Sequence, residues 1–71
     1  KVEALEFIVK CECSFTNVPL RELRTKKNNL IACIGRKRQI IIPNGEDHLE
    51  VGDSVVVVTM DHVDKFNDIL E

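Results

Sequence analysis

Two β-branched runs dominate the pattern of apolar and polar positions along this chain. Ile40–Ile42 and Val55–Val58 are uninterrupted, and neither alternates apolar with polar residues. A strand that is apolar on both faces of its pleat needs cover on both faces. The polar segment between the runs holds the turn pairs Asn44-Gly45 and Gly52-Asp53. We therefore expect two separate strands, the second at Ser54–Thr59, in a small sheet that completes its burial against another surface.

Three further segments have the pattern of strands. Apolar and polar residues alternate over Leu5–Cys13, which predicts a strand with its odd-numbered residues toward the core. Leu30–Ile34 is a compact apolar strand, and Gly35–Arg38 is the expected hairpin turn to a return strand at Gln39–Ile42. His48-Leu49 adds a very short candidate strand, so we expect four to five strands in total.

Two short helices complete the predicted elements. Asn17 is the expected cap of a helix at about Val18–Arg24, with Pro19 in its first turn. Asp61 is the expected cap of a terminal helix. One face of that helix would carry Val63, Phe66, Ile69 and Leu70. The order β-α-β-β-β-α predicts an α+β fold, a small mixed sheet with two helices that are too short to cover both of its faces.

Length and composition indicate one ordered domain. The chain has 71 residues, of which 44% are hydrophobic and 31% charged, and this balance argues against disorder. We expect a single domain over residues 1–71, and the start at Lys1 without Met suggests a fragment of a longer protein. No apolar run approaches the roughly 18 residues of a membrane span, so we expect no direct membrane insertion.

Charge is unevenly distributed along the chain. Residues 21–38 hold seven of the ten basic residues, whereas residues 39–71 hold eight acidic residues and one basic residue. The molecule should therefore have a basic end and an acidic end. Nucleic acid is not an expected partner, because the only aromatic residues are Phe7, Phe15 and Phe66 and the pI is about 5.6.

The sequence contains no pattern of catalytic or metal-ligating residues. Cys11 and Cys13 form no C-x-x-C pair, and we expect them to be buried, reduced thiols. No base is tied to a cysteine, and no paired carboxylates suggest acid–base chemistry. We expect neither an enzyme nor a metal site.

Four segments, taken in their order and spacing, resemble the RCK C-terminal domain, also called the TrkA C-terminal domain, of prokaryotic potassium-transport regulators. They read NVPLREL, LIACIGR, IIPNG and LEVGDSVVVV. The resemblance covers nearly the whole chain, Val2–Leu70. It implies a regulatory homodimer in the cytoplasm, associated with the membrane through a potassium transporter subunit that it gates.

The resemblance also implies an upstream Rossmann-type domain that binds NAD or ATP. This chain lacks the G-x-G-x-x-G spacing of such a domain, so neither cofactor is assigned to it. Some relatives bind cyclic di-AMP between two C-terminal subdomains. The resemblance thus implies a site for cyclic di-AMP or another small anion at the dimer cleft, near Ile31 and Ile34, with Arg36 supplying charge and Asn44 at the mouth.

Two alternatives stay open at this point. Arg36 is also a candidate for a solvated position at the tip of the Gly35–Arg38 hairpin. The whole domain is also a candidate for a purely structural oligomerisation module that binds no ligand.

Overall fold

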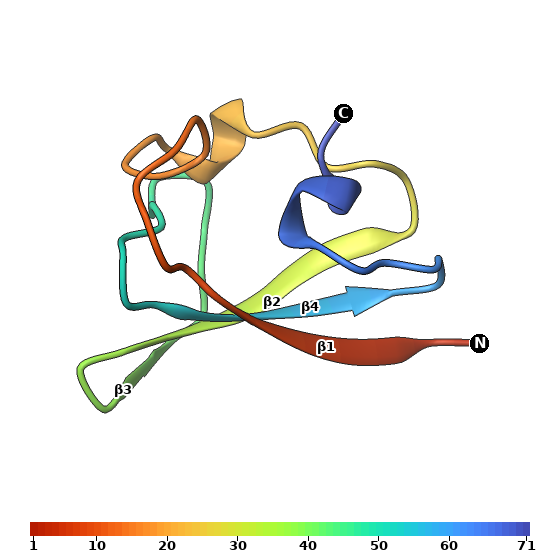
Figure 1. Ribbon diagram of the computed structural model, residues 1–71, viewed down its shortest axis with the longest axis horizontal. Helices are drawn as coiled ribbons and strands as arrows, with labels where there is room; N and C mark the ends of the chain where they lie inside the picture. The colour runs from red at the N-terminus through yellow and green to blue at the C-terminus, as the bar shows by residue number, and fades with distance from the viewer.

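One antiparallel sheet of four strands forms the framework of the computed structural model, which describes all residues, 1–71. In spatial order the strands are β1 (Glu3–Ile8), β4 (Ser54–Thr59), β2 (Asn29–Arg36) and β3 (Gln39–Ile41). Two 3-10 turns, η1 (Leu20–Glu22) and η2 (Phe66–Ile69), lie on one side of this sheet with the long loops that join β1 to β2 and β3 to β4, whereas the short β2–β3 turn continues the hairpin (Figure 1).

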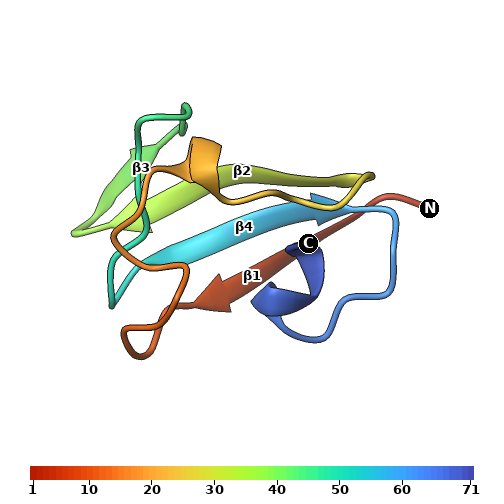
Figure 2. The same cartoon turned by 90° about the horizontal axis from the view of Figure 1, so that it is seen from above.

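The core lies between the sheet and these covering segments. In β4, which has the expected bounds, Val55 and Val57 are fully buried, whereas their neighbours Val56 and Val58 are not. The covering side chains that complete the buried cluster are Val9, Phe15, Leu49, Phe66 and Ile69. Seen from this side, η1 lies beside β2 and η2 toward β1 (Figure 2), where Phe66 packs against Phe7 with their ring centroids 6.2 Å apart. Each buried aliphatic side chain contributes about 1.5–3 kcal/mol.

A β-bulge at Ala32 changes which side of the sheet the following side chains of β2 point to. Ile31 pairs with Val57 and Cys33 with Val56, so Ala32 has no partner in β4. Because of this extra residue, Ile31 and Ile34 both face the covered side although they are three positions apart.

The other side of the sheet carries no covering segment (Figure 1). We call it the open face. By register it presents Ala4, Glu6, Ile8, Leu30, Cys33, Ile40, Ser54, Val56 and Val58. Its single charged side chain, Glu6, accepts a hydrogen bond from the Ser54 hydroxyl. Ile40 is 77% exposed and Leu30 62% exposed, so this face is strongly apolar and uncovered by the chain itself.

The predicted α+β fold with a mixed sheet is wrong. All strand pairs are antiparallel, and the expected helices are reduced to the single turns η1 and η2. The backbone that follows η1 and η2 is extended, because Thr25 and Leu70 form a β-bridge. In this bridge the Lys26 N–H donates to the Ile69 carbonyl at 2.7 Å. Asn17 adopts a φ of 61° and caps no helix. The fold is mostly β.

Strand boundaries also differ from those expected. β1 ends at Ile8, because Val9 turns to exchange backbone hydrogen bonds with Gly52 and Asp53 instead of continuing the ladder with β4. The expected strand at His48-Leu49 is absent. The residues at the hairpin tip are Lys37 and Arg38, with φ values of 49° and 65°. No helix in the structure reaches the length and hydrophobicity that crossing a bilayer requires.

Candidate functional site

Arg36 and Asp53 form the main polar contact of the interior. Arg36 is the last residue of β2, one position before the hairpin tip. Its Nε and Nη2 donate to Oδ1 and Oδ2 of Asp53 at 2.9 and 2.8 Å. The Asp53 side chain is 1% exposed, so the guanidinium is the partner that makes its burial tolerable. The expectation of a solvated tip position for Arg36 is wrong.

The same guanidinium holds the loop between β3 and β4. Arg36 Nη2 also donates to the His48 carbonyl at 2.8 Å, and its Nη1 lies 3.4 Å from Glu50 Oε2. The Glu50 amide donates to Asp53 Oδ2 at 2.8 Å, and its carboxylate lies 2.7 Å from His48 Nε2. We call these four residues the Arg36 clasp. They fix the end of the loop to the edge of the sheet.

Burial and hydrogen bonding act in opposite directions on Asp53. Burial alone would raise its pKa, but the hydrogen bonds from the Arg36 guanidinium and the Glu50 amide outweigh burial and hold the pKa below its ordinary value. The hydrogen bond to Asp53 raises the pKa of Arg36 in turn. The pair is therefore charged at neutral pH.

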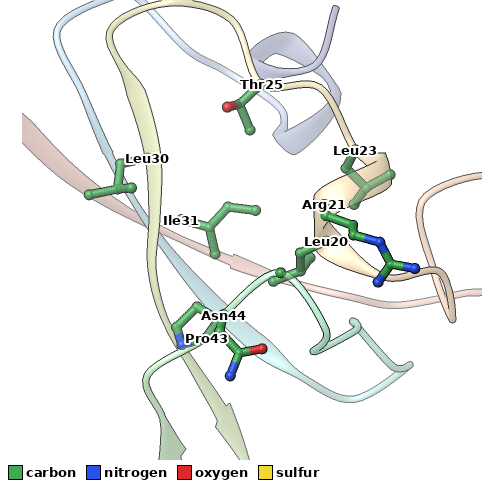
Figure 3. A pocket seen from close by; sticks show the side chains of 9 residues that line it. Leu20, Arg21, Leu23, Thr25, Leu30, Ile31, Pro43 and Asn44 are labelled. Atoms are coloured by element: carbon green, nitrogen blue, oxygen red, sulfur yellow. The ribbon is translucent and has the colours of Figure 1, made fainter.

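A hollow of about 220 Å³ lies beside β2, between η1 and the start of the loop after β3 (Figure 3). We call it the β2 hollow. It is lined by Leu20, Arg21, Leu23, Thr25, Leu30, Ile31, Pro43, Asn44 and Gly45. Three leucines and Ile31 supply its apolar part, and its polar groups include the Asn44 amide and the Arg21 guanidinium. A concave surface that combines apolar side chains with a few polar groups has the character of a small-ligand site.

Part of the β2 edge next to the hollow has no strand neighbour. β3 ends at Ile41, opposite Ile34, so the edge of residues 29–33 continues past the end of β3. An edge of this kind offers backbone donors and acceptors to whatever lies against it. The Ala32 bulge falls in this stretch, and Ile31 points into the space between β2 and η1 (Figure 3).

Backbone hydrogen bonds join the two walls of the β2 hollow. The amides of Asn17, Leu20 and Arg21 donate to the carbonyls of Leu49, Asp47 and Gly45 at 2.8, 2.8 and 3.0 Å. A Cβ on Gly45 would lie 3.1 Å from the Arg21 Cβ, so glycine permits this close approach. The η1 segment and the loop are therefore joined directly through their backbones.

The residues expected from the sequence are only partly brought together. Ile31 and Asn44 line the β2 hollow. Ile34 is fully buried, and Arg36 is held by Asp53 and does not line it. The lining residues that sequence reasoning missed are Leu20, Arg21, Leu23, Thr25, Leu30, Pro43 and Gly45. Leu20 and Leu23 carry a signal, because their three-residue spacing predicts one apolar face of a short helix, but that spacing alone does not indicate a hollow.

The thiols also lie elsewhere than expected. Cys11 and Cys13 are exposed and Cys33 is half-buried, because β1 ends before the C-x-C segment. No three histidine, cysteine or carboxylate side chains gather closely enough to hold a metal ion.

Comparison with known proteins adds one finding. The family described as the TrkA-C domain matches residues 4–71 of this chain. A search of curated proteins gave no match.

The charge of Asp53 predicts a loss of stability in acid. Folding lowers the pKa of Asp53 from its ordinary value of 3.8. The stability that the charged carboxylate adds to the folded state is therefore fully present above pH 3.8, and it is lost as the pH falls through the folded-state pKa. Asp68, whose pKa is lowered by hydrogen bonds from the Lys65 and Asp64 amides, acts in the same direction. We expect Asp53→Asn to cost roughly 2–4 kcal/mol at neutral pH and to flatten this dependence.

Urea unfolding between about pH 7 and pH 2.5 measures this effect. Asp64→Asn is the control, because the Asp64 side chain is 73% exposed and pairs only with His62. A profile for Asp53→Asn as steep as that of the wild type would show that Asp53 does not control the acid response.

Proposed function

Because the chain belongs to the TrkA-C domain family, we propose that it is the ligand-binding and dimerisation domain of a potassium-transport regulator. The family is one of regulatory rather than catalytic domains in proteins related to potassium transport. The observation that carries the ligand part of the proposal is the β2 hollow. The open face carries the dimerisation part.

A second copy of the chain is the proposed cover of the open face. Large apolar side chains on one side of a sheet need burial, and the covering segments of this chain all lie on the other side (Figure 1). Monomers rarely expose contiguous apolar patches above a few hundred Å². Glu6 is the only charged side chain on the open face. The open faces of two copies can therefore pack together in an isologous contact in which Glu6 is the only like charge that is buried.

The proposed ligand is a small anion with a flat base, with cyclic di-AMP as the candidate. A base would rest on aliphatic side chains such as Leu20 and Ile31, and the Asn44 amide offers polar contacts at the rim. Arg21 supports the charge requirement better than Arg36, because its side chain is 53% exposed at the hollow and its two carboxylate partners, Glu46 and Glu22, are exposed as well. The guanidinium of Arg36 is already satisfied by Asp53 and the His48 carbonyl.

The proposed regulatory role requires a larger assembly. We propose that it acts in the cytoplasm, next to a Rossmann-type domain that carries NAD or ATP, and that it gates a membrane potassium transporter subunit at the inner face of the membrane. Ligand binding beside the β2 edge would change how the domain packs in that assembly. The alternative is a structural oligomerisation module, for which the β2 hollow would bind nothing.

Dimerisation can be tested with a charge placed on the open face. We expect the wild-type domain to sediment as a dimer at micromolar concentration. Val58→Lys puts an unpaired charge in the middle of the face and should weaken the dimer by more than about 100-fold. Val51→Lys, at an exposed position in the loop before β4, should leave it intact. A wild-type domain that stays monomeric up to high concentration would contradict this part of the proposal.

Ligand binding can be tested by calorimetric titration of cyclic di-AMP. We expect Arg21→Ala to lose a charge-assisted contact and about 10- to 150-fold in affinity. Arg24→Ala is the matched control, since Arg24 lies three residues further on and does not line the β2 hollow. Equal affinity of both variants and the wild type would remove Arg21 from the site. No heat with the wild type would favour the structural alternative.

A further inference from the structure

Arg36 lies outside the β2 hollow, yet the contacts connect it to both of the hollow's walls. Its Nη2 holds the His48 carbonyl at 2.8 Å. The carbonyls on either side of His48, those of Asp47 and Leu49, accept the amides of Leu20 and Asn17, each at 2.8 Å. One guanidinium thus fixes the middle of the stretch that anchors η1.

We propose that Arg36 is a positioning residue for the β2 hollow, which it shapes by holding the loop carbonyls that anchor η1. The buried carboxylate of Asp53 orients the guanidinium through Nε and Nη2, so that Nη2 also faces the His48 carbonyl. Glu50 closes the arrangement, because its amide donates to Asp53 and its carboxylate lies near Nη1. The clasp therefore sets where the η1 wall stands relative to Ile31 and Asn44.

A planar, forked side chain is needed for this task. Lysine keeps the positive charge for Asp53, but its single ammonium does not reproduce the fork that binds both carboxylate oxygens and the carbonyl. Arg36→Lys should therefore loosen the loop while it leaves most of the charge pairing in place. This separates positioning from the general stability that the ion pair provides.

Amide hydrogen exchange on the isolated domain, without any ligand, tests the inference. We expect protection of the Asn17, Leu20 and Arg21 amides to fall about 10- to 100-fold in Arg36→Lys relative to the ladder amides of β1 and β4. Thr59→Ala is the control. It removes the hydrogen bond from Thr59 Oγ1 to Asn29 at the other end of β4 and should lower protection throughout without this local change.

A ratio of loop to ladder protection that is unchanged in Arg36→Lys would overturn the inference. A second measurement rests on the proposed function: cyclic di-AMP should bind Arg36→Lys about tenfold more weakly than the wild type. Absence of binding to the wild type would count against the proposed function alone, because the exchange result decides the positioning role without the ligand. Unchanged affinity together with a normal exchange ratio would assign Arg36 to stability only.

Discussion

The ion pair between Arg36 and Asp53 is the contact on which the rest of the structure depends. It joins the end of β2 to the start of β4 and places a charged carboxylate where the side chain is 1% exposed. A buried charge without its partner is strongly destabilising. The same guanidinium also donates a hydrogen bond to the His48 carbonyl. The shape of the loop that bounds the β2 hollow therefore depends on the ion pair between Arg36 and Asp53.

The second constraint is that this chain covers its sheet on one side only. Phe15, Leu49, Phe66 and Ile69 fill the covered side, and no comparable segment remains for the open face. An apolar face that the chain itself leaves uncovered is the feature that supports the proposed dimer contact. The proposed dimer contact and the β2 hollow therefore lie mostly on opposite sides of the same sheet, and Leu30 belongs to both.

Local pattern predicted the strands better than it predicted the helices. β4 has the expected bounds, because a run of β-branched valines favours a strand whatever lies next to it in the fold. The spacing of Leu20 and Leu23 fitted a helix equally well, and the deciding contact is the bridge between Thr25 and Leu70, which no local pattern reveals. The site was half predictable for the same reason. Ile31 and Asn44 line the hollow, whereas β2 continues two residues beyond Ile34, so Arg36 is the last residue of the strand and pairs with Gln39.

The central claim is that the β2 hollow is a ligand site on a regulatory domain. Mapping of backbone amide NMR shifts during titration with cyclic di-AMP tests it most directly. We expect the shifts to cluster at the residues lining the β2 hollow, Leu20, Ile31 and Asn44 among them. Shifts confined to the hollow of about 290 Å³ lined by Ser14, Arg24 and Leu70, or no shifts at all, would contradict it.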